Sequence, residues 1–130
     1  MIDKVGGIIL KDKKILVERK NNNKEECIIP GGKRENNETD LETLKRELKE
    51  ELSVDLIDAE YIDEYYDKAC FSNKPICVKT YLAKVEGKII CNNEIKEALW
   101  IDKNYKEKGI KVGSILEKYV IPYLIENNLI

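Results

Sequence analysis

The sequence predicts an α/β (α+β) fold: an α/β/α sandwich in which a mixed β-sheet lies between helices. Two observations predict it. Apolar and β-branched runs typical of strands occupy residues 5–19 and 54–85, whereas leucines recur every three or four residues from Thr39 to Leu52. The order is strands, helix, strands and a second helix, with neither repeat nor linker, so we expect residues 1–130 to form one domain.

Three strands are expected before the first helix. Val5 to Leu10 is apolar and rich in β-branched residues, and it can pair with Lys14 to Arg19 across a turn at Lys11-Asp12-Lys13. After a polar loop, Cys27 to Ile29 is expected to form a short strand. That strand runs directly into Pro30-Gly31-Gly32.

The first helix is expected from Thr39 to Leu52. Thr39 or Asp40 suits the N-cap, and Glu42 is close to the capping-box position. The helix should end near Leu52, because β-type residues follow it. Its expected apolar face consists of Leu41, Leu44, Leu48 and Leu52.

The second half of the chain predicts three strands and a second helix. Two longer strands are expected at Tyr61 to Tyr66 and Ile76 to Val85, and a short one at Ala98 to Ile101. Val112 to Ile125 carries apolar residues at helical spacing. Pro122 should kink or shorten this second helix, because proline lacks the backbone N–H that a helix interior uses.

Composition excludes several function classes. The net charge is −2, with 42% hydrophobic and 37% charged residues, which is a globular balance. It gives no reason to expect a nucleic-acid polymer or a membrane as partner. The sequence contains no His. Ser-His-Asp and Cys-His catalysis and His-ligated zinc are therefore excluded, and a general base must be Glu, Asp, Lys, Tyr or Cys.

The four cysteines are expected to be reduced. None of them belongs to a C-x-x-C pair. The first ten residues do not resemble a signal peptide, so we expect a cytoplasmic protein. The cysteines are Cys27, Cys70, Cys77 and Cys91.

Glutamates gather on one face of the predicted first helix. Glu47, Glu50 and Glu51 have i, i+3 and i+4 spacing, which brings three like charges together. Such a helix is usually just a solvated charged surface. The alternative is that a divalent cation neutralises the carboxylates, and oxygen ligands favour Mg²⁺ or Mn²⁺. Gly31 and Gly32 would let the backbone approach that cation.

The loop before the helix has its own predicted ion pair. Glu38 closes the loop, and Arg46 on the helix is its natural partner. This pair would attach the loop to the helix and orient the carboxylates without touching a substrate.

The spacing of the complete segment is far more specific than the helix alone. Five residues separate Gly32 from Glu38, and seven more lead to Arg46-Glu47-Leu48-Lys49-Glu50-Glu51-Leu52-Ser53-Val54. This segment resembles the signature of the Nudix hydrolase family, G-x5-E-x7-R-E-U-x-E-E-x-G-U, where U is aliphatic. The one departure is Ser53 in place of the last Gly. Ser adopts the left-handed conformation at a cost of roughly 1 kcal/mol, so the helix end should survive.

The resemblance implies a Mg²⁺-dependent pyrophosphohydrolase, with Mn²⁺ as the alternative metal. The substrate would be a nucleoside diphosphate linked to another group, most simply a nucleoside triphosphate or a nucleotide sugar. Glu47, Glu50 and Glu51 would be the catalytic residues, and Glu47 is a reasonable general base. Glu94 would complete the metal site, with Glu97 as the alternative. The other implied metal ligands are Gly32, Glu47, Glu50 and Glu51.

Three cations are candidates for binding the substrate phosphates: Arg19, Lys33 and Arg34. An alternative function is a catalytically silent Nudix fold that binds a nucleotide or a partner protein. The intact Glu47, Glu50 and Glu51 speak against it. A homodimer is compatible with the resemblance, since many relatives are dimers.

Overall fold

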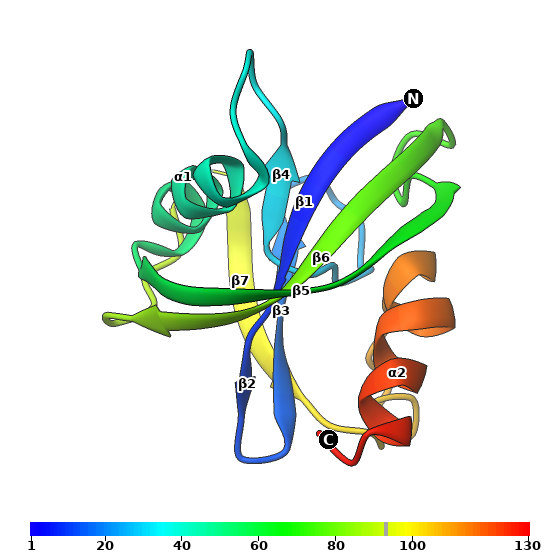
Figure 1. Cartoon of the computed structure of the whole chain (residues 1–130). Coiled ribbons are helices and arrows are strands. Elements are labelled where there is room, and N and C mark those ends of the chain that lie inside the picture. The colour runs from blue at the N-terminus through cyan, green and yellow to red at the C-terminus, as the bar shows by residue number, and fades with distance from the viewer. Residues whose placement is uncertain (93) are drawn as a thin grey trace.

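A computed structural model describes residues 1–92 and 94–130, and this part of the chain contains two sheets and two helical segments (Figure 1). The predicted fold class, mixed α and β, is confirmed. The larger sheet has the order β4-β1-β6-β5. It is mixed, because β1 is parallel to β6 while the other two pairs are antiparallel. Its strands are β1 (Ile2–Ile8), β4 (Gly31–Lys33), β5 (Asp55–Lys68) and β6 (Pro75–Glu86).

The second sheet is antiparallel and has the order β2-β3-β7. Its strands are β2 (Leu10–Lys11), β3 (Lys14–Lys20) and β7 (Ile95–Ile101). The predicted turn joins β2 to β3. Asp12 and Lys13 both have positive φ, 50° and 62°, as the tightest hairpin turns require.

Two of the strands predicted before the first helix differ from the structure, and the strands predicted at Tyr61 to Tyr66 and Ala98 to Ile101 are longer than expected. The run from Val5 to Leu10 is divided between the two sheets, because the chain passes from β1 to β2 at Ile9. Periodicity cannot detect such a corner within a continuous apolar run. Residues 27–29 form only isolated bridges, Cys27 to Val112 and Ile28 to Glu18. The regular strand follows at Gly31–Lys33, where glycine conceals it from a propensity argument.

The first helix, α1 (Asp40–Leu52), has the ends that were predicted. Thr39 is the N-cap and forms a complete capping box with Glu42. Ser53 is the C-cap and adopts the left-handed conformation with φ 61°. Leu41 differs from the prediction: it is 45% exposed, so the buried face consists of the three later leucines.

The last helical segment contains the disturbance expected from Pro122. A π-helical turn, Leu116–Val120, precedes α2 (Ile121–Glu126). The Ile121 N–H donates to the carbonyl of Leu116, five residues earlier. The wider turn lies directly before Pro122, which cannot supply an N–H of its own.

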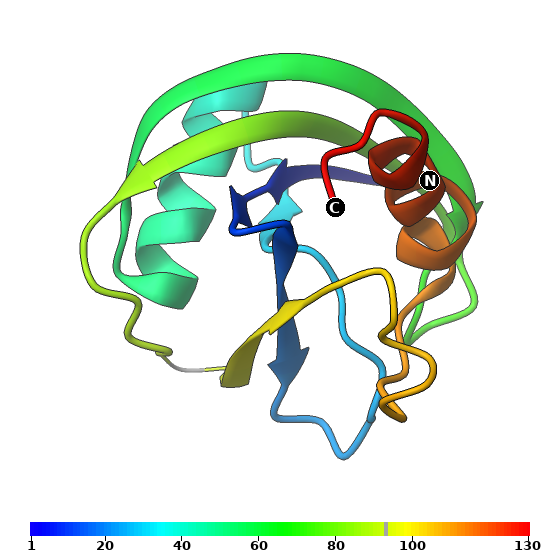
Figure 2. The same cartoon turned by 90° about the horizontal axis from the view of Figure 1, so that it is seen from below.

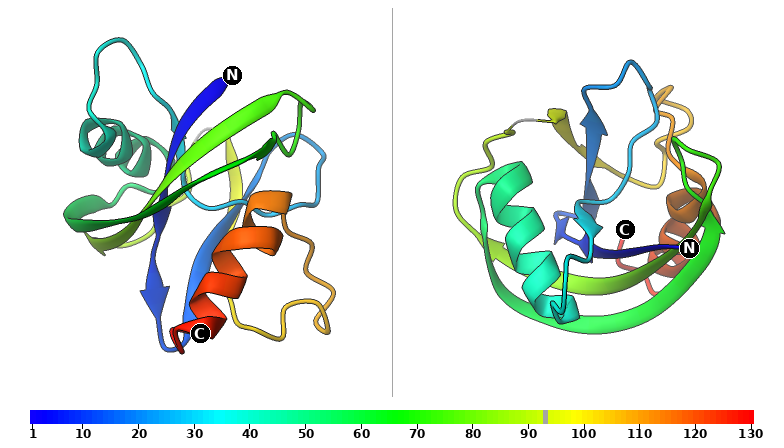
Figure 3. Two further views of the ribbon diagram at one scale, coloured as in Figure 1. Left: turned by 45° about the vertical axis from the view of Figure 1, so that its right-hand side comes forward. Right: turned by 90° about the horizontal axis from the view of Figure 1, so that it is seen from above.

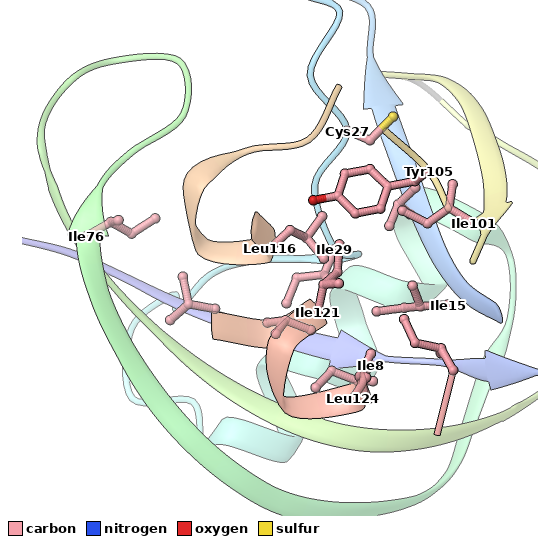
Figure 4. Close-up of a cluster of buried hydrophobic side chains, with 14 residues drawn as sticks. Ile8, Ile15, Cys27, Ile29, Ile76, Ile101, Tyr105, Leu116, Ile121 and Leu124 are labelled. Atoms are coloured by element: carbon pink, nitrogen blue, oxygen red, sulfur yellow. The ribbon is translucent and has the colours of Figure 1, made fainter. Parts of the chain in front are cut away.

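Two apolar clusters fill the interior, one under each helix. The α1 cluster consists of Val5, Ile9, Leu16, Leu44, Leu48, Leu52, Val54, Ala83 and Ile95. The α2 cluster (Figure 4) consists of Ile8, Ile15, Val17, Cys27, Ile29, Ile76, Val78, Ile101, Tyr105, Leu116, Val120, Ile121, Leu124 and Ile130. Strand β3 contributes to both clusters, because successive side chains on a strand point to opposite faces.

Strands β5 and β6 form a long curved ribbon that extends behind both helices (Figures 2 and 3). Leu56 and Ala59, early in β5, pack against the α1 cluster. Ile62 and Tyr65, later in the same strand, pack against the α2 cluster. The Tyr65 ring also stacks on Tyr119 of the π turn, with centroids 4.9 Å apart. One ribbon thus supports both halves of the molecule.

Candidate active site

The two glycines of β4 lie directly against the glutamates of α1. A Cβ atom at Gly32 would lie 2.3 Å from Cδ of Glu47, so only glycine allows this approach. Gly31 has φ +144°, and a Cβ there would lie 2.1 Å from the carbonyl oxygen of Val5. The Gly31 N–H donates to Oε1 of Glu51 over 3.0 Å. The glycine pair therefore brings backbone and two carboxylates into contact.

Arg46 connects the loop, the strand and the helix. Its Nε and Nη2 donate to the two oxygens of Glu38 over 2.7 and 2.9 Å, so the predicted pair is present. Nη2 also donates to the carbonyl of Lys33, and Nη1 to Oε1 of Glu47 over 2.8 Å. Arg46, followed by the backbone N–H of Glu35, lowers the pKa of Glu38 to about 2. Glu38 is therefore held as a carboxylate in the loop.

The three helix glutamates occupy three different environments. Glu50 is the most exposed, at 54% of its side chain, and its carboxylate lies 3.4 Å from Arg46. Glu47 is 15% exposed, and burial raises its pKa although Arg46 opposes the shift. Glu51 is 8% exposed and points inward to β4. The predicted acidic face is thus graded from open solvent to the protein interior.

A fourth glutamate, which the sequence analysis missed, faces Glu51 from β3. Glu18 is 0% exposed, and among the described residues neither of its carboxylate oxygens has a hydrogen-bond partner. Burial and then the charge of Glu51 raise the pKa of Glu18, and burial also raises that of Glu51. One signal was available in the sequence: strand alternation places Glu18 on the same face as buried Leu16.

Two lysines near the carboxylates were also missed. Lys4 lies on β1, and burial followed by the charge of Lys20 lowers its pKa, whereas Glu51 and Glu18 raise it. Lys20 ends β3 and lowers the pKa of Glu18, Glu47 and Glu51 by its charge. Both cations offset part of the acidic charge. Neither has a neighbour in the sequence that would distinguish it from an ordinary surface lysine.

The site fits a hard divalent cation, because its side-chain ligands are all oxygens and the two buried Glu18 oxygens have no hydrogen-bond donor among the described residues. The glutamates are not yet arranged as ligands: within residues 1–92 and 94–130, no three acidic or thiol side chains converge on one point. Arg46 holds Glu47 and Glu50, while Glu51 is bonded to Gly31. A cation here would compete with Arg46 for Glu47.

The family model of the NUDIX domain matches residues 2–105, which is most of the chain. The chain belongs to the Nudix family. Its signature segment, Gly32 to Val54, is called the Nudix box from here on. The predicted hydrolase acting on phosphorus-containing acid anhydrides is confirmed at the level of this family.

Solved structures share the Nudix fold at low sequence identity. The solution structure of the E. coli ORF135 protein has a TM-score of 0.70 and 24% identity, covering 96% of this chain and 86% of that one. A structure from a study of MutT from Aliivibrio salmonicida and Vibrio cholerae has a TM-score of 0.75 and 18% identity, covering 97% of this chain and 98% of that one. A UDP-X diphosphatase has a TM-score of 0.74 and 16% identity, covering 98% of this chain and 63% of that one. Among curated proteins, none matches significantly.

Two of the predicted Nudix site residues form a pair across β3 and β7. The guanidinium of Arg19 donates to Glu97 over 2.7 Å and to the carbonyl of Glu25 over 2.9 Å. It lies beside Cys27 of the α2 cluster, on the opposite face of β3 from Glu18. Glu94 is exposed in a turn, and its carbonyl accepts from Asn21. The roles of these residues in metal or phosphate binding stay predictions.

The other two predicted cations flank the Nudix box. Lys33 is exposed and follows the glycine pair. Arg34 already has three partners: the carboxylates of Asp3 and Asp40 and the carbonyl of Glu38. These bonds attach the first strand and the helix start to the loop. Phosphate binding by Lys33 and Arg34 stays a prediction, and Lys33 is the one with the freer position beside the glycines.

Two pockets share Lys20 as a lining residue, and the first of them also includes Gly32 and Lys33 of the Nudix box. The first has a volume of about 260 Å³ and lies between the larger sheet and the start of the last helical segment. It is lined by the glycine pair, by Lys4, Lys20 and Lys33, and by apolar side chains such as Phe71 and Ile115. The second, of about 460 Å³, is polar and contains Arg19.

Among the described residues, no helix is long and apolar enough to span a membrane. All four cysteines are free thiols. Cys27 and Cys77 are buried, whereas Cys70 is exposed.

Proposed function

We propose that the chain is a Mg²⁺-dependent pyrophosphohydrolase that cleaves a diphosphate linkage in a nucleoside triphosphate or a nucleotide sugar. One observation carries the proposal. Glu47 and Glu51 touch Gly32 and Gly31, and the same two glycines line the 260 Å³ pocket. Carboxylates for a metal and a pocket for an organic group thus share one stretch of backbone.

Glu47, Glu50 and Glu51, with the carbonyl of Gly32, are the residues that would hold Mg²⁺ or Mn²⁺. When bound, such a cation lowers the pKa of a water molecule and screens the charge that develops on the phosphates. Glu47 and Glu51 are largely shielded from solvent. Charges in such a setting interact more strongly than in open water.

Glu47 is our candidate for the general base. Burial raises its pKa, which brings a carboxylate closer to the pH at which it accepts a proton efficiently. Its bond to Arg46 fixes the orientation of the carboxylate. Arg46 is in turn positioned by Glu38, so the ion pair acts through Glu47.

The pocket has a charged part and an apolar part, which suit different groups of the substrate. Lys4, Lys20 and Lys33 suit the phosphates, and the apolar wall suits a base or a sugar. The volume of about 260 Å³ lies just below the range of about 300–1,000 Å³ for drug-sized ligands. A single base therefore fits better than a complete nucleotide. Relatives of similar fold include MutT proteins and a UDP-X diphosphatase, which favours testing both substrate kinds.

The test is turnover of nucleoside triphosphates, nucleotide sugars and dinucleoside polyphosphates with Mg²⁺, compared with EDTA. The last group is included because Lys20 connects the two pockets. Glu47→Gln and Glu50→Gln should each lower kcat by at least about 100-fold while the fold is kept. Glu60→Gln, on the exposed part of β5, is the matched control and should retain wild-type activity.

Wild-type protein that turns over none of these compounds, or variants that match it, would contradict the mechanism. Binding of a nucleotide without turnover would favour the alternative, a catalytically silent Nudix module. A cytoplasmic location and a homodimer stay predictions. Gel filtration tests for the dimer.

A further inference from the structure

Glu18 is fixed in the middle of the second sheet. Its N–H donates to the carbonyl of Ile28 over 2.8 Å, and its carbonyl accepts from the Ile28 N–H over 2.9 Å. On its other side it is paired with Ala98 of β7. Because both edges of the backbone are held, the side chain cannot turn to solvent without breaking the sheet.

The Glu18 carboxylate is directed at another carboxylate. It is 0% exposed, and in the described part of the chain neither oxygen has a hydrogen-bond partner. Glu51 faces it and uses one oxygen to accept from the Gly31 N–H. Lys4 and Lys20 interact with the Glu18 carboxylate through charge but do not form a hydrogen bond with it. Two buried carboxyl groups that face each other cannot both be ionised unless a cation lies between them.

A divalent cation satisfies every part of this arrangement. It would bond to the two Glu18 oxygens, which have no donor in the described part of the chain, neutralise two carboxylates and lie beside the glycine pair at the pocket. Stability of the sheet alone does not explain a glutamate at this position, since an apolar side chain of similar size packs as well in a buried strand.

We propose that Glu18 is a further ligand of the divalent cation, which is therefore held between β3 and α1 instead of by the helix alone. The inference rests on the proposed function and adds a ligand from outside the Nudix box. It has a structural consequence: the cation joins the second sheet to the first helix. Metal binding should therefore stabilise the fold as well as supply the chemistry.

Two substitutions separate a metal ligand from a buried acid. Glu18→Gln keeps the shape and can donate to Glu51, so it replaces a protonated carboxyl group well. Glu18→Met removes all polarity at similar length. Both should fold without metal, at least as stably as the wild type, because each removes a buried carboxyl group whose oxygens have no hydrogen-bond donor among the described residues.

The experiment measures Mn²⁺ binding by isothermal titration calorimetry and the thermal transition with and without Mn²⁺. Wild type and the control Glu60→Gln should bind Mn²⁺ equally. Glu18→Gln and Glu18→Met should bind at least about tenfold more weakly, which is the lower range of loss for partners outside the direct ligand set. The rise in Tm that Mn²⁺ gives the wild type should shrink in both variants.

Each other outcome is decisive. Glu18→Gln that binds Mn²⁺ as tightly as the wild type overturns the assignment while leaving the proposed function in place. Failure of both variants to fold without metal shows that the sheet itself needs Glu18, which also overturns it. Wild-type protein that binds no Mn²⁺ removes the inference and the metal dependence together.

Discussion

The half of the molecule under α1 and the half under α2 have different interiors, although one ribbon supports both. The α1 half buries Glu18, Thr43 and Glu51 beside its leucines. The α2 cluster is formed almost entirely by aliphatic side chains, with Cys27 and Tyr105 among them. Ile29 and Leu116 lie in that cluster (Figure 4) and also line the apolar wall of the pocket. The buried acidic groups therefore depend on the α1 half and the apolar wall of the pocket on the α2 half, and the two halves meet at Gly31 and Gly32.

Leu124→Ala should give the largest effect, and it should affect stability alone. Leu124 is 0% exposed and belongs to the α2 cluster. Removing its side chain leaves a cavity, which should lower the free energy of unfolding by about 2–5 kcal/mol. Urea denaturation measures this loss. Mn²⁺ affinity of the folded protein should stay unchanged, and a parallel loss of affinity would show that the two halves are not separate.

Gly32→Ala should change the α1 half, and it should lower activity more than stability. The added Cβ would lie 2.3 Å from Cδ of Glu47 and must displace that carboxylate. A shift of about 1 Å at a catalytic group lowers rate by roughly 100-fold. The measurement is kcat with Mg²⁺, next to the thermal transition. Gly109→Asn, in the second pocket and outside the Nudix box, is the control, because no heavy atom of the described residues lies within 4 Å of a Cβ there and Asn tolerates its φ of +76°.

The metal-free protein should lose stability as the pH rises. The raised pKa values of Glu18 and Glu51 mean that the folded state binds protons more tightly than the unfolded chain. This contribution is fully present below the ordinary value of 4.5 and decreases as the pH rises through the raised values. Tm without metal should fall by at least about 3 °C between pH 5.5 and pH 8.

The same transition in Glu18→Met isolates the effect. That variant should show a smaller pH dependence, and Mg²⁺ should restore the wild type at pH 8. An identical slope in both proteins would assign the pH dependence to groups elsewhere in the chain.

Glu38→Gln should give the smallest effect. The pKa of Glu38 is lowered to about 2, so its stabilising contribution is present above 4.5 and is lost as the pH falls through the lowered value. The variant should therefore lower Tm slightly at neutral pH, and by progressively less as the pH falls toward 2. Activity should fall less than in Glu47→Gln, because Glu38 acts through Arg46. Equal losses of activity would place Glu38 in the reaction itself.

Local patterns predicted what neighbouring residues determine. The ends of α1 follow from Thr39, Glu42 and Ser53, all of which act within a few residues of the chain. The pairing of Glu38 with Arg46 follows from the spacing of the Nudix box. In both cases the partners are close in sequence, so one pattern contains the complete interaction.

Contacts between distant segments were not predictable in the same way. Glu18 meets Glu51 only because β3 and α1 come together in space, and nothing near either residue indicates the other. Arg19 pairs with Glu97 for the same reason. Leu41 follows the leucine spacing yet is exposed, because it lies one turn before the leucines of α1 that pack into the α1 cluster.

The curved ribbon of β5 and β6 has a consequence for how the chain melts. Its 14-residue strand β5 contributes to the α1 cluster at one end and to the α2 cluster at the other. The pairing of β5 with β6 extends from Asp55 to Lys68, with register shifts after Leu56 and after Tyr61. Opening one cluster therefore disturbs a strand pair on which the other cluster also packs. Both halves should therefore unfold in one cooperative step, so that a ligand bound at the charged half protects amides of the apolar half from hydrogen exchange.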